Sequence, residues 1–305
     1  ATFAASSTQV CMPTSVTFTE RASSPNGPIV AYAWSFGDNT TTATRNPVKN
    51  YATAGRYDVS LKVTDIFGCT DSVSFPRYIN VLDSTRPSNI LAKVATVNNN
   101  RVIDLNWKPS ADSAFVQYKV FRKDETPAGS AFTLVHASTN RNDSAFTDVS
   151  ARVNQTPYTY LVVQKNICNR ESNMDLAFAH TNVFVNAAPS ADVRKVGVDL
   201  KWTKYVGFLA NTRGNTVANY KVYRKELTSN NFTLVATLSG DDTSYTDKGL
   251  CTENYTYMVE AIAQNGVVST SNWGTSRAAV FNYAGNMELM NATVTDNNKV
   301  ALIWK

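Results

Sequence analysis

The residues that most often carry out chemistry are few in this chain and lie apart. Among its 305 residues are two histidines, His136 and His180, and four cysteines. The sequence has no G-x-S-x-G, H-E-x-x-H or C-x-x-C motif, and no glycine-rich loop that could hold phosphates. The adjacent Asp241 and Asp242 lie beside a predicted turn and need no catalytic role. The sequence therefore predicts no catalytic residue, no enzyme and no cofactor.

Asp38 is the carboxylate that most resembles a metal ligand. It follows Gly37 at the end of the stretch W-S-F-G-D, residues 34–38. A calcium site draws on several carboxylates at close spacing, and no second carboxylate stands at such a spacing from Asp38. Asp side chains in turns commonly accept hydrogen bonds from the amides that follow them. We therefore expect Asp38 to stabilise a turn, and we expect no metal site.

Two further features are suited to binding. Trp273, in the stretch S-N-W-G-T-S, is a candidate exposed aromatic residue that could stack on a sugar ring, with ordinary packing as the alternative. The loop of residues 205–217 is longer than the corresponding loop near residue 110. Since loops on a rigid scaffold often carry binding residues, its Phe208, Leu209 and Arg213 are candidates for a binding surface. Packing into a domain junction is the alternative for this loop.

The composition favours strands and argues against some classes of partner. The chain has 14 Tyr and 14 Phe, abundant Thr, Ser and Asn, and only 17% charged residues, a blend that favours strands and turns. The net charge of +5 is scattered, without the basic stripe and interleaved aromatic residues of a nucleic-acid-binding surface. No apolar run is long enough to span a membrane. We therefore expect no nucleic-acid partner and no membrane insertion.

A tandem repeat organises the second and third parts of the chain. RVIDLNWK (101–108) returns as VGVDLKWT (196–203), and YKVFRK (118–123) returns as YKVYRK (220–225). Blocks with a period of two, bounded by Asn, Asp, Gly or Pro, predict short strands. About seven such strands per hundred residues predict a two-sheet sandwich. We expect the Trp of each copy, and the Tyr pair of its sixth strand, to face the core.

The last stretch, KVALIWK (299–305), repeats the strand that ends in Trp. One edge of a sandwich cannot bury its own Trp, so we expect residues 287–305 to be the first strands of a truncated fourth repeat. Linkers that contain Pro then delimit the predicted domains, which are 1–83, 84–188, 189–286 and 287–305. The predicted fold class is all-β, with tandem immunoglobulin-like β-sandwiches in an elongated array.

Two family resemblances support these domains. The complete repeats resemble fibronectin type III domains in the Trp of the second strand, the Y-x-V of the third and the Y-x-Y of the sixth. The N-terminal segment resembles the PKD domain. The motifs W-x-F-G-D, P-x-x-x-Y and G-x-Y-x-V-x-L-x-V occur there in order, at 34–38, 47–51 and 55–63.

The resemblance to PKD domains implies a disulfide. PKD domains of secreted bacterial proteins carry a Cys pair at corresponding places, which implies a bond between Cys11 and Cys69 in an oxidising compartment. Cys168 and Cys251 are expected to be free and buried. A contact from Cys251 to a thiol of a further repeat is the alternative.

The combination of domains resembles the repeat region of large surface proteins of gliding bacteria that are exported by type IX secretion. This resemblance implies a non-catalytic extracellular stalk or adhesin segment at the cell surface, which spaces or presents binding surfaces. The expected partners are neighbouring domains of the same long chain, and polysaccharide or other cell-surface proteins. One alternative is the accessory region of a secreted hydrolase, as a spacer or carbohydrate-targeting region. The other is a subunit of an extracellular filament.

Overall fold

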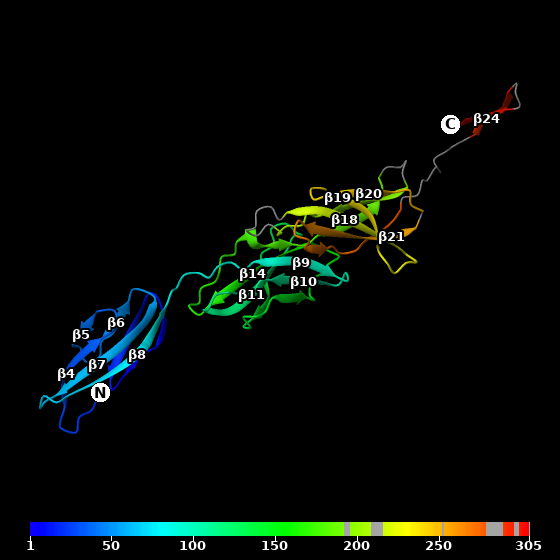
Figure 1. Ribbon diagram of the computed structural model, residues 1–305. Coiled ribbons are helices and arrows are strands. Elements are labelled where there is room, and N and C mark those ends of the chain that lie inside the picture. Colours follow the sequence, from blue (N-terminus) through cyan, green and yellow to red (C-terminus); the bar gives the residue numbers. More distant parts are fainter. Residues whose placement is uncertain (192–195, 209–215, 252, 279–288, 296–298, 305) are drawn as a thin grey trace. The chain divides into compact units, whose positions relative to one another are not determined.

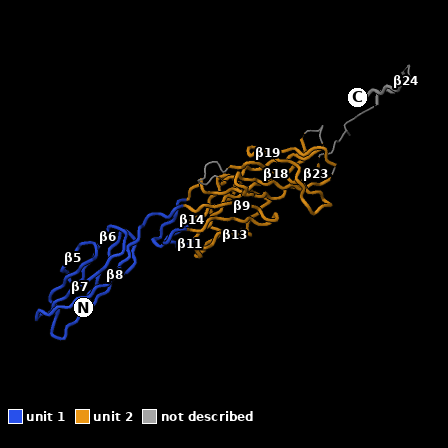
Figure 2. Tube along the Cα trace, viewed as in Figure 1, with its two compact units in different colours: residues 1–88, 111–117, 164–173 blue, residues 89–110, 118–163, 174–305 orange. Residues whose placement is uncertain are grey.

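The chain forms three successive β-sandwiches and a final pair of strands, which confirms the predicted all-β class with tandem sandwiches (Figure 1). The computed structural model describes residues 1–305 apart from 192–195, 209–215, 252, 279–288, 296–298 and 305. By their contacts, these residues divide into two compact units (Figure 2). The first unit comprises residues 1–88, 111–117 and 164–173, and the second comprises 89–110, 118–163 and 174–305.

The first sandwich has sheets of three and five strands, ordered β1-β3-β6 and β2-β8-β7-β4-β5. Strand β2 runs parallel to β8, whereas β7 and β8 form a long antiparallel hairpin. The strands are β1 (Phe3–Ala5), β2 (Gln9–Cys11), β3 (Thr14–Glu20), β4 (Ile29–Ser35), β5 (Thr41–Thr42), β6 (Val48–Tyr51), β7 (Gly55–Asp65) and β8 (Thr70–Leu82).

An aromatic cluster fills the core of the first sandwich. Trp34 is 1% exposed, lies edge-on to Phe3 with ring centroids 5.0 Å apart, and donates its indole N–H to the Thr44 carbonyl at 3.0 Å. Because successive side chains of a strand point to opposite faces, the alternation along β7 places one set of apolar residues in the core. These are Tyr57, Val59, Leu61 and Val63, as the sequence predicts.

Asp38 stabilises a turn, which confirms its expected structural role. Its Oδ1 accepts a hydrogen bond from the Thr40 N–H at 3.2 Å, and its Oδ2 pairs with Lys49 Nζ at 2.6 Å. Burial raises the pKa of Asp38, but the hydrogen bonds from Lys49 and Thr40 outweigh it and leave the pKa below its usual range. The preceding Gly37 has φ +79°, and a Cβ there would lie 2.6 Å from the Asp58 carbonyl oxygen.

The second and third sandwiches share one plan. In the second sandwich, a three-stranded sheet ordered β13-β10-β9 faces a four-stranded sheet ordered β12-β11-β14-β15. In the third, a three-stranded sheet ordered β16-β17-β20 faces a sheet ordered β19-β18-β21-β22, in which β23 also pairs with β21. The second sandwich contains β9 (Ala92–Asn98), β10 (Val102–Trp107), β11 (Phe115–Asp124), β12 (Thr133–Ser138), β13 (Ala145–Asp148), β14 (Tyr158–Asn166), the 3₁₀ helix η1 (Leu176–Phe178) and β15 (His180–Thr181). The third contains β16 (Val185–Pro189), β17 (Gly197–Trp202), β18 (Val217–Glu226), β19 (Thr233–Ser239), β20 (Ser244–Lys248), β21 (Asn254–Ala263), β22 (Val268–Thr270) and β23 (Gly274–Arg277).

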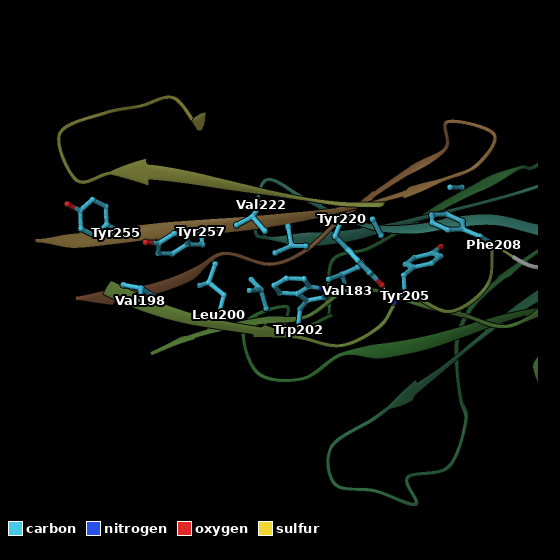
Figure 3. Packing of buried hydrophobic residues seen from close by; sticks show 14 of the residues in the cluster. Val183, Val198, Leu200, Trp202, Tyr205, Phe208, Tyr220, Val222, Tyr255 and Tyr257 are labelled. Atoms are coloured by element: carbon cyan, nitrogen blue, oxygen red, sulfur yellow. Dashed lines mark hydrogen bonds between the residues drawn. The ribbon is translucent and has the colours of Figure 1, made fainter. Parts of the chain in front are cut away.

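In the second and third sandwiches the repeated Trp and Tyr residues face the cores, as predicted, whereas the side chain of Trp304 lies outside what the structure describes. Trp107 and Trp202 are buried, and each lies against the Tyr of the next strand, with ring centroids 5.7 Å and 5.6 Å apart. Figure 3 shows this packing in the third sandwich, where Trp202 lies among residues of both sheets. The predicted Tyr pairs of the sixth strands are also buried, and they are Tyr158 with Tyr160 and Tyr255 with Tyr257.

A buried Arg–Asp–Tyr group recurs in both sandwiches. In the second sandwich, Asp148 Oδ2 accepts hydrogen bonds from Arg122 Nη1 at 2.9 Å and from the Tyr160 hydroxyl at 2.8 Å. Burial raises the pKa of Asp148, but hydrogen bonds from Ser150, Arg122 and Tyr160 lower it by more, so the carboxylate stays ionised. The third sandwich repeats the group with Arg224, Asp247 and Tyr257.

The final strands, β24 (Leu289–Thr295) and β25 (Lys299–Trp304), pair antiparallel within the predicted fourth repeat. Upstream, β16 begins at Val185, ahead of the predicted domain boundary at residue 189. Within the part of the chain that the structure describes, no helix has the length and apolarity needed to cross a membrane.

The predicted bond between Cys11 and Cys69 is wrong, because Cys11 is bonded to Cys168 with their Cα atoms 5.5 Å apart. Cys11 ends β2 and lies opposite Leu82, at the far end of β8. Cys69 lies in the turn before β8, where its N–H donates to Asp65 Oδ1. The 13 residues of β8 separate the two cysteines by more than about 30 Å at about 3.3 Å per residue.

Of the other two cysteine predictions, the one for Cys168 is wrong and the one for Cys251 is partly right. Cys168, expected to be free and buried, forms the bond to Cys11 from the loop after β14. That loop belongs to the first compact unit. Cys251 is free, as expected, but it is exposed, and so is the unbonded Cys69.

Candidate functional site at the junction of the second and third sandwiches

A buried histidine joins the second and third sandwiches, and the residues of both that meet there belong to the second compact unit. His180, on β15, has no exposed surface. Its Nε2 lies 3.1 Å from the Ala92 carbonyl oxygen on β9, and its Nδ1 lies 2.7 Å from the hydroxyl of Tyr205. Tyr205 belongs to the third sandwich, three residues after Trp202. We call His180, Tyr205 and the residues that contact them the His180 cluster.

The donors and acceptors of the His180 cluster fit one arrangement. A carbonyl oxygen can only accept, so Nε2 of His180 carries the proton and Nδ1 accepts one from the Tyr205 hydroxyl. That hydroxyl in turn accepts a hydrogen bond from the Ala95 N–H at 3.1 Å. Burial lowers the pKa of His180 to about 4, although the hydrogen bond to Ala92 opposes the shift. The imidazole is therefore neutral at physiological pH and serves as a structural link.

Gly207 allows the third sandwich to approach His180 closely. Its φ is +121°, and a Cβ at this position would lie 2.4 Å from His180 Cγ. Any side chain here would therefore collide with the imidazole ring and would also strain the backbone. The preceding Val206 exchanges backbone hydrogen bonds with Thr181 of β15, at 3.0 Å and 3.4 Å. Backbone pairing thus continues from one sandwich into the other.

A second row of contacts joins β9 of the second sandwich to β22 of the third. The Thr270 N–H donates to the Thr96 hydroxyl at 2.8 Å, and the Ser269 hydroxyl donates to the Ala95 carbonyl at 2.7 Å. Val94 of β9 packs into the core cluster of the third sandwich. Because both apolar and polar groups are buried along this line, the two sandwiches form a docked pair rather than separate beads.

A hollow of about 350 Å³ opens along the same junction, and we call it the junction hollow. One side is the turn of residues 98–100, where Asn100 Oδ1 accepts a hydrogen bond from the backbone N–H of Trp273 at 2.7 Å. The other side holds Trp273 with the ring of Phe232 edge-on at 5.3 Å. Lys225 Nζ lies 4.4 Å from the centroid of the Trp273 ring, a cation–π contact that orients the indole.

The junction hollow is suited to binding rather than to acid–base chemistry. It combines aromatic rings with the amides of residues 98–100 and the carboxylate of Asp104. Asp104 is held by hydrogen bonds from Asn98 at 2.8 Å and Thr147 at 2.6 Å. Apolar rings with a few fixed polar groups typify pockets for small polar ligands. Among the described residues, no three His, Cys, Asp or Glu side chains gather where they could hold a metal ion.

The structure brings two of the predicted site residues to this junction. Phe208 is buried and stacks on Tyr205 with ring centroids 4.0 Å apart (Figure 3), so it packs at the domain junction and is not an exposed ring. Trp273 is half-buried, not exposed, and lines the junction hollow. Leu209 and Arg213 lie outside the described residues.

Sequence reasoning missed His180 and Tyr205. The signal was present in the repeat, since Trp-x-x-Ser at 107–110 becomes Trp-x-x-Tyr at 202–205. A small polar residue replaced by a Tyr at an otherwise matched position indicates a new contact. For His180 the sequence contains no comparable sign.

The comparisons with known proteins concern first the N-terminal segment. Residues 1–81 match the PKD domain. The chain thus has a PKD domain at its N-terminus, and two further β-sandwiches follow it. A protein named microbial collagenase, from Vibrio alginolyticus, is 41% identical over 69 residues, which make up 22% of this chain. The chain spans only 8% of the length of that collagenase.

Three solved structures show looser similarity. The FN1–FN3 domains of chicken CNTN1 are 12% identical, covering 92% of this chain and 98% of that one, with a TM-score of 0.28. A two-domain fibronectin type III segment of chicken tenascin is 15% identical, covering 64% and 100%, with a TM-score of 0.24. Pectate lyase Pel3 of Pectobacterium carotovorum is 19% identical, covering 37% and 30%, with a TM-score of 0.25. These scores are low, so only the strand order shows that the second and third domains are β-sandwiches.

Proposed function

We propose that this chain is a non-catalytic segment of a large extracellular protein, which spaces or presents binding surfaces. The observation that carries the proposal is the docked junction, where the buried His180 cluster fixes the third sandwich on the second. A spacer needs such junctions because a flexible linker would not hold its ends apart. Large side chains fill the sandwich cores, which supports a structural role for each sandwich.

The proposed location is the cell surface. The Cys11–Cys168 disulfide supports an oxidising compartment, because such bonds persist outside the reducing cytosol. The proposal includes export by type IX secretion in a gliding bacterium, which rests on the resemblance of the domain combination alone. A C-terminal sorting domain in the complete gene tests this route, and a gene without one would count against it.

The proposed ligand is polysaccharide, bound at the junction hollow by Trp273 and the neighbouring amides. Sugar rings offer an apolar C–H face to an aromatic ring and hydroxyl groups to amides, which matches the lining of the hollow. The test is retention of the purified chain on insoluble cell-surface polysaccharide. We expect Trp273→Ala to reduce retention at least tenfold while the melting temperature stays within a few degrees.

Phe67 provides a matched control for this experiment. It is 75% exposed in the turn between β7 and β8, far along the chain from the junction hollow. We expect Phe67→Ala to leave retention unchanged. Equal retention of wild type and Trp273→Ala would overturn the polysaccharide site.

An accessory region of a secreted hydrolase is the second candidate, favoured by the 41% identity with the microbial collagenase over 69 residues. In that case the PKD domain would target a catalytic domain to its substrate. Sedimentation with fibrillar collagen distinguishes the two. Binding to collagen that Phe67→Ala reduces and Trp273→Ala leaves intact would favour the hydrolase, whereas polysaccharide binding lost in Trp273→Ala favours the spacer.

A further inference from the structure

The Cys11–Cys168 disulfide closes a large covalent loop in the chain. Its two cysteines are 157 positions apart in the sequence. Between them lie strands β3 to β8 of the PKD domain and β9 to β14 of the second sandwich, together with the linker that joins them. Only β1 and β2 precede the loop, and β15 and the third sandwich follow it.

Side chains near the disulfide fix the linker to the loop after β14, and all of these residues belong to the first compact unit. Gln164 Nε2 donates to the Ser88 carbonyl at 2.7 Å, and Asn166 Nδ2 donates to the Thr85 carbonyl at 3.1 Å. Here the linker residue is the donor: Arg86 Nη1 donates to the Glu171 carbonyl at 3.2 Å. The covalent bond is therefore reinforced by a set of directed hydrogen bonds on both sides of the linker.

We infer that the Cys11–Cys168 disulfide carries tension along the chain and shields residues 12–167 from it. The inference deepens the proposed function, because a spacer is pulled at its two ends. Tension that enters at Ala1 passes along the backbone to Cys11, crosses the sulfur–sulfur bond, and continues from Cys168 toward Lys305. Residues 12–167 lie on a closed side branch, so tension cannot lengthen them while the bond is intact.

The consequence is a large difference in extensible length. A fully extended chain spans about 3.5 Å per residue, so the 157-residue loop hides about 550 Å of chain from any pull on the ends. With the bond intact, tension can peel off β1 and β2 and can unfold the elements after Cys168. The core strands of the PKD domain and most of the second sandwich carry no tension while the bond is intact.

The two remaining cysteines provide a control, because replacing them shows whether loss of any cysteine changes the stretched length or only loss of this bond. Cys69 and Cys251 are both free and exposed. Replacing either one removes a thiol without opening the covalent loop. The two pairs of cysteines therefore provide a test and its matched control within one chain.

The experiment is single-molecule stretching of the full chain, held by peptide tags at both ends, with and without reductant. We expect a fully unfolded length about 550 Å shorter for the oxidised chain than for the reduced chain. The double variant Cys11→Ser, Cys168→Ser should show the longer length in both conditions. The double variant Cys69→Ser, Cys251→Ser should behave as wild type.

Equal lengths for the oxidised and reduced wild type would overturn the inference, and so would a non-reducing peptide map that joins Cys11 to Cys69. Neither result would affect the proposed spacer, because its docked junction is formed by hydrogen bonds other than the disulfide and is tested by other variants. Conversely, a spacer function could fail in the retention experiment while the difference in stretched length remained.

Discussion

The second and third sandwiches are two copies of one repeat, and they differ where they meet. In both copies the amide three residues after the core Trp donates to the hydroxyl of a buried Tyr. Ser110 donates to Tyr118 at 2.6 Å, and Tyr205 donates to Tyr220 at 2.9 Å. The backbone contact is thus repeated, but the side chain at that position is not. In the third sandwich it is the Tyr that reaches Ala95 and His180 of its neighbour.

The comparison separates two kinds of residue. Those that recur, such as Trp107 and Trp202 and the Arg–Asp–Tyr groups, hold each sandwich together. Those without a counterpart, such as His180 and Tyr205, join one sandwich to the next. Variants of the first kind should therefore weaken either copy alike, whereas variants of the second kind should weaken the junction.

The largest effects are expected for the repeated carboxylates, Asp148 and Asp247. Each accepts hydrogen bonds from an Arg and a buried Tyr hydroxyl, so alanine would remove the carboxylate that pairs with the Arg and would leave the Tyr hydroxyl buried without its acceptor. We expect Asp148→Ala and Asp247→Ala each to cost about 3 to 5 kcal/mol in the free energy of unfolding. Urea denaturation measures this, and a loss in only one copy would break the equivalence of the sandwiches.

A somewhat smaller loss is expected for Gly207→Ala, which places a Cβ 2.4 Å from His180 Cγ at a φ of +121°. Backbone strain and overpacking together should cost about 3 to 4 kcal/mol. Gly266→Ala is the matched control, since its φ is +84° and nothing lies within 4 Å of the added Cβ. We expect the control to lose only about 1 kcal/mol from strain. Similar melting temperatures for the two variants would contradict the tight junction.

The protonation of His180 provides the next test. Its pKa in the folded chain is about 4, below the ordinary value of 6.5, so the unfolded chain binds the proton more readily. Its contribution to stability is complete above pH 6.5 and is lost as the pH falls toward 4, a loss of about 3 kcal/mol. Urea titrations across this range should show a slope that His180→Gln reduces. An unchanged slope in His180→Gln would show that another group is responsible.

The smallest effect is expected for Tyr205→Phe, which removes only a hydroxyl. The Ala95 N–H would lose its acceptor and His180 Nδ1 would lose its donor, at a cost of about 2 kcal/mol. Tyr223→Phe removes a half-buried hydroxyl that contacts Glu260 within one sandwich, and it should cost less than about 1 kcal/mol. If urea denaturation showed the same loss of stability for both variants, the Tyr205 hydroxyl would contribute no more at the junction than an ordinary hydroxyl within one sandwich.

Much of the fold could be predicted from the sequence, because it depends on local alternation. A period of two along a strand decides which side chains face inward, and it places Trp107, Trp202 and Tyr57 in their cores. The turn at Asp38 could be predicted for a similar reason, since its hydrogen bonds involve neighbours in the chain. In these cases the information lies within a few residues of the feature.

The disulfide and the junction could not be predicted in this way, because both depend on which surfaces meet. Cys11 is bonded to a residue 157 positions away, although Cys69 is closer along the chain. For the loop of residues 205–217, the sequence leaves a binding surface and packing into a junction both open, and the structure shows Phe208 packed against Tyr205 at the junction. Nothing in the sequence around His180 distinguishes it from an ordinary strand residue. It links the two sandwiches only because Gly207 of the next sandwich lies close to its ring.

Hydrogen exchange at the Ala95 amide tests the docked junction most directly, because that N–H is satisfied by Tyr205 of the neighbouring sandwich. In wild type the amide should be protected by at least a hundredfold relative to an unstructured peptide. In Tyr205→Phe the protection should fall at least tenfold, while the Val222 amide inside the third sandwich keeps its rate. Rapid exchange at Ala95 in the wild-type chain would contradict the account, since the two sandwiches would then be independent.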